Sequence, residues 1–578
     1  MKTEKTNFER RAVPASFSLL HPATIRSDQQ DPFLALSPGA MRDLGLDEII
    51  AAFTPEHEHQ KEIRNLFSQL PRDPEVIAYR QAVLDDLLAN PDLVEAFASL
   101  LPVIVSLFDE SYRYNREMSW LHEVAWRAGK LQNMIDCLEK LEQTLHSFES
   151  RILSEGLLTL REEIRTAQSD PKYQSLVREL PPLLAKLQGC HSLTIGVNLD
   201  TSLRPVQAVL LSVNEKPFTD QSLLNRLFGV RTDQAGIAPL HSAPRRVVDG
   251  PYAFPVHSDL GLAVDPMLIP LFADLAKILE KTAIPIADQL NQYVGLHGRL
   301  FTELRQGLIF YLGAIRFIQL FQKRGLPMCR PQIAPADERI CEVRNSYNVH
   351  LVLRHLELEN ITGSAITKND ILIGSAGHIL ILTGPNRGGK TTYMQGVGVV
   401  HILAQAGCYV PGERATISPL DQIFTHFPLE EKPDTDSGRF GEEAMRLGKI
   451  FEHVTRHSLV LLNETLSSTS FSESLYLAED IVRILRRVGA RAIYSTHLHE
   501  LAVRVVELNE SVPGESRIIS VVSSPIDTGV QVTGGEVIRT YKLEVRPPLG
   551  QSYAREIAAR YGISYQQLES VLSGRGVL

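Results

Sequence analysis

Gly384-Pro-Asn-Arg-Gly-Gly-Lys-Thr391 follows the pattern G-x-x-x-x-G-K-[ST], which is typical of loops that bind the phosphates of a nucleotide. The apolar run 378–383 before it predicts a buried strand, and residues 393–406 after it predict a helix that ends at Gly407. In this context glycines let backbone amides approach the phosphates, and the start of the helix adds a partial positive charge. The sequence therefore predicts a site for ATP or GTP.

The same loop supplies two side chains with separate tasks. We expect Lys390 to reach the outer phosphates and the hydroxyl of Thr391 to hold Mg²⁺. The residues predicted to contact the nucleotide are Gly384, Pro385, Asn386, Arg387, Gly388, Gly389, Lys390, Thr391 and Thr392.

A second apolar run, 458–462, ends in Asn463-Glu464, the place where a nucleotide-hydrolysing enzyme carries its acidic residues. We expect Glu464 to activate the attacking water as general base. Asn463 stands where an aspartate usually contacts the magnesium shell, and an amide supplies no charge to a cation. The sequence therefore predicts that Mg²⁺ is held weakly, or mainly by Thr391, phosphates and water, and that turnover is slow.

A third apolar run, 490–494, leads to Ser495-Thr-His497-Leu-His499. We expect His497 to hydrogen-bond the terminal phosphate as charge develops on it. Three alternatives stay open: a core histidine, a metal pair formed with His499, or a fragment of a hydrolase metal site. A metal site lacks an evident third ligand nearby in the sequence.

Length and composition bound the rest of the chain. The 578 residues predict several domains, and the net charge of −9 means that DNA would have to meet a local basic face. The longest apolar run, 308–315, is far shorter than a membrane span, and the beginning of the chain has no apolar signal region. The five cysteines have neither metal nor disulfide spacing, so we expect a soluble protein of the reducing cytoplasm.

The pattern along the chain predicts a multidomain protein with three parts. Residues 1–110 predict a helical core unit, and residues 111–330 predict long helices with a β-containing insert at about 191–260. An apolar stripe from Leu131 to Ile152 predicts a single long helix, and helical periodicity returns from Pro266 to Arg324 with a break at Pro285. Residues 331–578 alternate strand and helix, which is typical of an α/β layer around a mostly parallel sheet, and end in a helical tail.

Ordered blocks of the last part resemble the ATPase domain of the MutS family. They are residues 382–394, 407–411, 419–425, 458–464 with 468–470, and 495–501. Residues 541–558 are similar to the stretch that follows that domain, and residues 35–330 resemble more weakly the core, lever and clamp regions.

The resemblance implies a P-loop ATPase domain of the ATP-binding-cassette type and a homodimer whose ATP sites are completed by the opposite subunit. Ser437, in the loop 436–443, is the residue implied to act on the partner's nucleotide. DNA, duplex or branched, would be held by a clamp between the lever helices. The chain departs from the family pattern in three ways: Asn463 replaces an aspartate, Gly438-Arg439 precedes Phe440, and no room remains for the mismatch-reading and connector domains.

Our leading hypothesis is a MutS-like ATPase in which ATP binding closes a homodimer on DNA during repair or recombination, without direct mismatch reading. The alternative is a non-catalytic, ATP-gated assembly module that binds a protein partner, which the negative charge and Asn463 favour. An unrelated P-loop kinase or transporter ATPase explains the first loop only.

Overall fold

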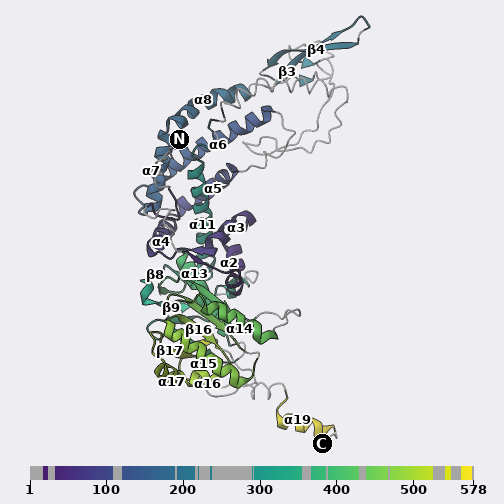
Figure 1. Ribbon diagram of the computed structural model, residues 1–578. Helices are drawn as coiled ribbons and strands as arrows, with labels where there is room; N and C mark the ends of the chain where they lie inside the picture. The colour runs from purple at the N-terminus through teal and green to yellow at the C-terminus, as the bar shows by residue number, and fades with distance from the viewer. Residues whose placement is uncertain are drawn as a thin grey trace, which may run out of the picture. The chain divides into compact units, whose positions relative to one another are not determined.

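The computed structural model (Figure 1) divides the chain into two compact units. One unit comprises Met1–Val94, Ser150–Thr159 and Gln306–Leu578, and the other comprises Glu95–Glu149 and Leu160–Arg305. The structure describes residues 17–23, 33–108, 120–188, 192–202, 204–214, 216, 219–220, 235–236, 290, 292–293, 295–354, 366–385, 388–428, 438–466, 469–524, 540–548 and 562–575. Asn386, Arg387, Ser437 and Pro285, which the sequence analysis singled out, lie outside these residues.

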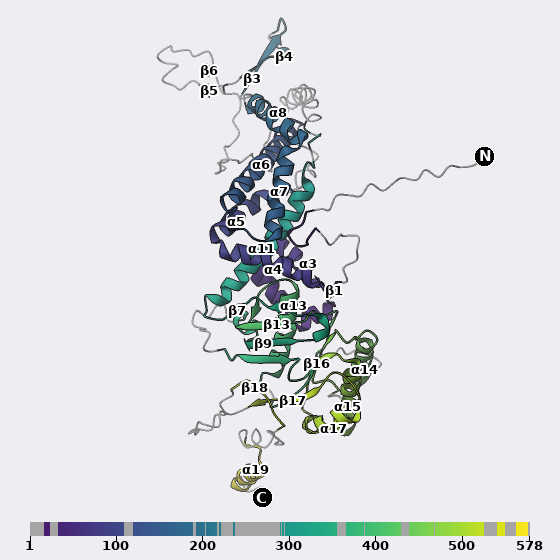
Figure 2. The same ribbon diagram turned by 90° about the vertical axis from the view of Figure 1, so that its left-hand side faces the viewer.

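A six-stranded sheet forms the centre of the first unit. Its order is β14-β15-β16-β11-β17-β18, and every neighbouring pair is parallel except β17 and β18, which Figure 2 shows side by side. The strands are β11 (Ile379–Thr383), β14 (Ile423–His426), β15 (Leu459–Asn463), β16 (Arg491–Ser495), β17 (Ile518–Ser524) and β18 (Lys542–Val545). The three apolar runs of the sequence are thus β11, β15 and β16, which adjoin one another.

Helices cover both faces of this sheet, as the continuous apolar character of its strands requires. On one face lies α13 (Lys390–Gln405), where a Cβ atom placed on Gly398 would lie 3.2 Å from Leu461. On the other face, strand residues such as Val460 and Tyr494 share a buried apolar cluster with Val482. The helices of that face are α14 (Gly438–Phe451), α15 (Phe471–Val488), α16 (His499–Val503) and α17 (Val505–Ser511).

The early residues of this unit form short helices around α13, as predicted for a mostly helical segment. They are α1 (Pro38–Asp43), α2 (Leu46–Phe53), α3 (His57–Ser68) and α4 (Pro74–Ala89), and β1 (Leu34–Ala35) pairs with β2 (Gln69–Leu70). The next helix, α5 (Pro91–Ser106), belongs to the second unit from Glu95 onward. Gln395 and Gln405 of α13 donate hydrogen bonds to the carbonyls of Asp43 and Pro71, at 2.9 and 3.1 Å. The amide side chains of α13 therefore tie it to these helices.

A second sheet of the same unit has the order β10-β9-β13-β8. Its strands are β8 (Gln332–Ile333), β9 (Cys341–Ser346), β10 (Asn369–Ile373) and β13 (Arg414–Ile417). The remaining elements here are α11 (Gly298–Gln322), whose residues up to Arg305 belong to the second unit, the pair β7 (Met328–Cys329) and β12 (Val410–Pro411), a 3₁₀ turn (Ala336–Glu338), α12 (His350–Leu353) and the tail helix α19 (Tyr565–Gly574).

The second unit contains helices and a hairpin. They are α6 (Trp120–Ser147), most of α7 (Glu155–Ser169), α8 (Pro171–Gln188), the antiparallel strands β3 (Ser192–Leu199) and β4 (Pro205–Asn214), and the short pair β5 (Thr219–Asp220) and β6 (Ala235–Gly236). The strands predicted at 192–199 and 206–213 are therefore confirmed. Among the described residues no single helix has the length and apolar character needed to cross a bilayer; only the pair α4 and α5, bent by 104°, meets that test, by length and composition.

The prediction of one helix from Leu131 to Ile152 is wrong at its end. α6 stops at Ser147, and Ile152 is buried beyond it. The carboxylate of Asp86 accepts hydrogen bonds from the backbone amides of Leu153 and Ser154, at 2.9 and 2.6 Å. These two amides therefore have an acceptor outside the helix. The apolar spacing continues past the end of α6 because residues before and after that end are buried, among them Leu145 and Ile152.

Candidate nucleotide site

The glycine loop joins the end of β11 to the start of α13. Gly384 has φ +142° and Gly389, the residue that caps α13, has φ +86°, a conformation that side chains rarely adopt. The helix begins at Lys390, three residues before the predicted start at Tyr393. Its first amides have no acceptor within the helix, so they point at the space beyond the loop.

Ser523, near the end of β17, contacts the loop directly. Its hydroxyl donates a hydrogen bond of 2.6 Å to the carbonyl of Gly388. A Cβ atom added to Gly384 or Gly388 would lie 2.8 Å from a side-chain atom of this serine. No sequence pattern predicts Ser523 as part of the site, because only the order of the strands brings β17 beside β11.

Lys390 is buried and bonds to its own loop. Its ammonium donates hydrogen bonds to the carbonyls of Gly384 and Pro385, both at 3.0 Å. Burial lowers the pKa of Lys390, and the nearby charge of Glu464 opposes that shift. The lysine was expected to reach outward to phosphates, and in this state its charge is instead satisfied by two carbonyls.

Thr391 and Asn463 meet at the base of the site. The hydroxyl of Thr391 donates a hydrogen bond of 3.2 Å to the side-chain oxygen of Asn463, which is buried at the end of β15. Hydroxyl and amide oxygens, with the carboxylate of Glu464 next in the chain, are ligands that suit Mg²⁺ when phosphates complete its shell. Within the described residues no three His, Cys, Asp or Glu side chains gather as a metal site, so the pair of His497 and His499 has no third ligand of these types there.

Glu464 and His497 contact each other directly. Their side chains follow the adjacent parallel strands β15 and β16, and the Nε2 atom of His497 lies 2.9 Å from a carboxylate oxygen of Glu464. The hydrogen bond from His497 lowers the pKa of Glu464, although burial opposes this, so the carboxylate is ionised at neutral pH. Each residue has a predicted role of its own, and the contact between them is a finding of the structure.

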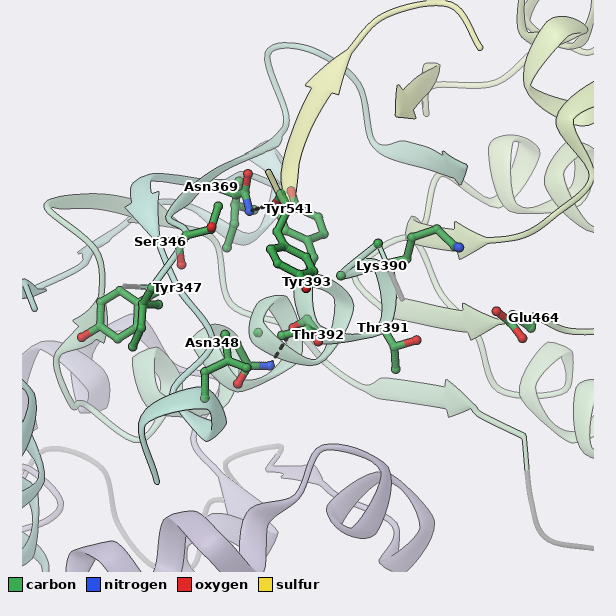
Figure 3. Close-up of a pocket in the computed structure, with 17 residues that line it drawn as sticks. Ser346, Tyr347, Asn348, Asn369, Lys390, Thr391, Thr392, Tyr393, Glu464 and Tyr541 are labelled. Atoms are coloured by element: carbon green, nitrogen blue, oxygen red, sulfur yellow. Dashed lines mark hydrogen bonds between the residues drawn. The ribbon is translucent and has the colours of Figure 1, made fainter. Parts of the chain in front are cut away.

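A cavity of about 550 Å³ opens beside the loop (Figure 3). Lys390 and Thr391 lie on its side toward Glu464, and Tyr541 and Asn369 lie on the opposite side. Tyr541 lies next to Gly389, and the side chain of Asn369 donates a hydrogen bond of 3.0 Å to the carbonyl of Tyr541. The cavity thus has a polar end rich in backbone amides and an end with an aromatic ring.

Asn348 and Tyr541 are among the residues of this cavity that were not predicted. Asn348 donates a hydrogen bond of 2.6 Å to the carbonyl of Thr392 and so fixes the first turn of α13. Asn348 and Tyr541 come from segments without a nucleotide-binding pattern, although Tyr541 opens the tail block 541–558. Only the fold brings them to the loop.

Two family models match separate stretches of the chain. The model of MutS domain V matches residues 380–550, which hold the loop and all three strand ends, and the model of the MutS2 N-terminal domain matches residues 72–324. The chain belongs to the MutS family. This confirms the resemblance drawn from the ordered blocks of the last part.

Curated relatives of this MutS-family chain carry the name DNA mismatch repair protein MutS. That of Geobacillus thermodenitrificans is 30% identical over 233 residues, which are 39% of this chain and 25% of the relative. That of Bacillus pumilus is 37% identical over 143 residues, 25% of this chain and 17% of the relative. That of Geobacillus sp. (strain WCH70) is 27% identical over 288 residues, 49% of this chain and 32% of the relative. The matches therefore span about a third of these relatives or less.

Proposed function

We propose that this MutS-family chain binds and slowly hydrolyses ATP at a P-loop site of the ATP-binding-cassette type. The observation that carries the proposal is the convergence of three strand ends. β11 leads to Lys390 and Thr391, β15 ends at Asn463 and Glu464, and β16 leads to His497. Ligands of parallel sheets bind at the carboxyl ends of the strands, which is where these groups meet.

The nucleotide would lie along the cavity. Its base would meet Tyr541 and its phosphates the amides of the loop, with Asn386 and Arg387 among the phosphate contacts. Lys390 would exchange its two carbonyl acceptors, Gly384 and Pro385, for phosphate oxygens, a stronger charge-assisted bond. The loss of these two hydrogen bonds offsets a small part of the free energy that Lys390 gains when it binds phosphate.

Hydrolysis would depend on Glu464 and His497. The ionised carboxylate of Glu464 accepts the proton of the attacking water, and His497 keeps the carboxylate oriented through the 2.9 Å contact or turns to the terminal phosphate. Thr391 and Asn463 would hold Mg²⁺, which when bound neutralises charge on the phosphates. Because Asn463 contributes no charge, we expect a slow reaction.

Two substitutions test the ATPase assignment. Lys390→Ala should weaken the binding of a fluorescent ATP analogue at least tenfold, because a buried ammonium beside the phosphates is lost. Glu464→Gln should keep that affinity and lose at least 100-fold in phosphate release. Glu510→Gln, an exposed glutamate of α17, is the matched control and should match the parent. Turnover by Glu464→Gln at the parental rate would contradict the assignment.

We further propose that ATP closes a homodimer on duplex or branched DNA in the cytoplasm, in repair or recombination, without direct mismatch reading. Ser437 would reach the partner's nucleotide, residues 1–110 would form the core, and residues 111–330 the levers with a clamp insert at about 191–260. The exposed cations Arg316 of α11 and Lys323, the residue just after this helix, offer contacts for phosphates in a chain of net charge −9.

Sedimentation and filter binding test this second proposal. The Glu464→Gln variant with ATP and Mg²⁺ should sediment as a dimer, and binding to DNA should weaken steeply as salt rises. A monomer at saturating nucleotide would refute the closing dimer.

Asn463 also favours the alternative, a non-catalytic ATP-gated module for a protein partner, because an uncharged residue holds the metal of a catalytic site poorly. Nucleotide-dependent dimers that neither bind DNA at low salt nor release phosphate would support that alternative.

A further inference from the structure

The segment after β15 has an unusual backbone. Glu464 has φ +50° and Leu466 has φ +65°, both in the left-handed region that residues with side chains rarely adopt. Such conformations persist where the surroundings hold them in place, and they gather at functional sites. Since Glu464 is the proposed general base, the contacts that hold residues 464–466 also set the position of its carboxylate.

Four side chains hold this segment, and each comes from a different element. Ser474 of α15 donates a hydrogen bond of 2.7 Å to the carbonyl of Leu466, and the hydroxyl of Tyr494 on β16 donates one of 3.3 Å to the carbonyl of Thr465. The ring of His426 on β14 lies 3.1 Å from the hydroxyl of Thr465. The fourth is Glu443 of α14, whose carboxylate accepts a hydrogen bond of 3.1 Å from the backbone amide of Leu466.

Glu443 differs from the other three in the element that carries it. Ser474, Tyr494 and His426 belong to the strands and helix that enclose β15. α14 begins at Gly438, directly after Ser437, and its outer side is open to solvent, with Met445 57% exposed. A second tie from the same helix, Arg446, donates to the carbonyl of Phe427 at 3.3 and 3.2 Å.

We infer that Glu443 is a positioning residue for Glu464, linking the placement of α14 to the geometry of the catalytic carboxylate. The inference rests on the proposed ATPase function. Glu443 accepts a hydrogen bond from the backbone amide two residues beyond Glu464, and it acts on the reaction through that backbone. Any event that shifts the start of α14, such as nucleotide capture by the adjoining Ser437 in a dimer, would then change the rate of hydrolysis.

The geometry requires an acceptor at residue 443 and does not require its charge. Glutamine keeps a carbonyl oxygen at the same reach and should still accept the amide of Leu466, whereas alanine leaves that amide without its partner. A role limited to the stability of the fold would alter the melting temperature without separating binding from turnover. Positioning of the base predicts a loss in kcat with an unchanged affinity for nucleotide.

The experiment compares four variants of the full chain with the parent. Glu443→Ala should lose at least tenfold in kcat while the Kd for a fluorescent ATP analogue stays within twofold, and Glu443→Gln should recover to within threefold of the parental kcat. Glu442→Ala, the neighbouring carboxylate on α14, should match the parent. Ser474→Ala, which removes the bond on the other side of Leu466, should also lower kcat more than it weakens binding.

Hydrogen exchange gives a readout that does not depend on turnover. Peptides that contain Leu466 should exchange at least tenfold faster in Glu443→Ala than in the parent, and Glu443→Gln should restore protection. Parental kcat or parental exchange in Glu443→Ala, or a Glu443→Gln variant as slow as alanine, would overturn the inference. A parent that releases no phosphate would refute the ATPase proposal, while unchanged exchange in Glu443→Ala refutes the positioning role alone.

Discussion

At the level of single residues, the glycines at 384 and 388 are required by contact as well as by conformation. Ser523 approaches the loop so closely that a Cβ atom at either position would lie 2.8 Å from it. At Gly384 the backbone carbonyl of Ser523 would also lie 3.1 Å from that atom, and φ is +142°. The atoms of Ser523 nearest to that position are its Cβ and its backbone, which cannot rotate away. A methyl group at residue 384 must therefore displace the loop or β17.

Gly384→Ala is therefore expected to lower the affinity for ATP analogues at least tenfold and to destabilise the unit by roughly 1–3 kcal/mol, the usual cost of backbone strain. Fluorescence titration and thermal unfolding measure the two effects. Gly448→Ala is the matched control, because it lies in α14 with no atom within 4 Å of the added methyl group. That control should keep parental affinity and gain about 0.5–1 kcal/mol from helix propensity.

The charged residues of the site are satisfied in pairs before any ligand arrives. Lys390 has two carbonyls of its own loop, and Glu464 has His497. Lys390 and Glu464 thus exchange these partners for others when a nucleotide binds. Both charged groups have hydrogen-bond partners with and without the nucleotide. This keeps the desolvation cost of a half-buried site low.

At the level of elements, α13 is fixed at both ends. Its start carries the glycine loop, and its end meets Arg80 of α4, a fully buried cation. The guanidinium of Arg80 donates to the carbonyl of Leu20 at 2.8 Å and to that of Ala406, the last cap of α13, at 3.4 Å. It also lies 5.9 Å from the ring centre of Phe310 on α11. A cation at this place complements the negative end of the helix dipole.

Arg80→Met should consequently lower the unfolding free energy of the unit by roughly 1–3 kcal/mol, because buried carbonyls lose their donor. Thermal or urea unfolding measures the loss. Arg487→Met, an exposed arginine near the end of α15, removes the same charge and should change stability by less than about 0.5 kcal/mol. Equal effects of the two substitutions would contradict a capping role for Arg80.

The elements also mark how far sequence reasoning extends. β11, β15 and β16 could be predicted, because each is a short apolar run: β15 ends at Asn463, and the other two lead into the glycine loop and His497. The end of α6 could not, since the carboxylate that accepts the amides of Leu153 and Ser154 lies at Asp86, more than 60 positions earlier. Ser523, Asn348 and Tyr541 reach the site only through strand order and loop packing, which periodicity does not encode.

At the level of the whole molecule, the first unit is assembled from three separate stretches of chain. Local pattern assigned residues 1–110 and 331–578 to different parts, whereas residues of both pack around α13. Hydrophobic periodicity identifies a buried face but does not predict which segment of the chain covers that face. The covering segment is determined by contacts between residues far apart in the sequence, such as the hydrogen bond of Gln405 to Pro71.

Buried and half-buried histidines give this first unit a predictable response to acid. Burial lowers the pKa of His426 and of His378 to about 4 each, and of His21 to about 3, with nearby arginines adding to the shift. In the unfolded chain these rings take up protons near pH 6.5, whereas in the folded unit they stay neutral to about pH 4. The unfolded state therefore binds more protons in that window, and stability falls as pH falls from 6.5 towards 4.

Each such histidine can contribute a slope of up to about 1.4 kcal/mol per pH unit in that window. The depressed pKa of Glu464 acts in the same direction only below the ordinary carboxylate range, where the carboxylate takes up a proton, so it does not affect the comparison at pH 7.5 and 5.5. The urea midpoint of the parent should drop between these two values. His426→Gln, which can keep a bond to Thr465, should reduce the drop measurably, whereas His453→Gln, exposed on the turn after α14, should leave it unchanged. An equal drop in the His426 variant and the parent would mean that the ring of His426 takes up protons as readily in the folded unit as in the unfolded chain.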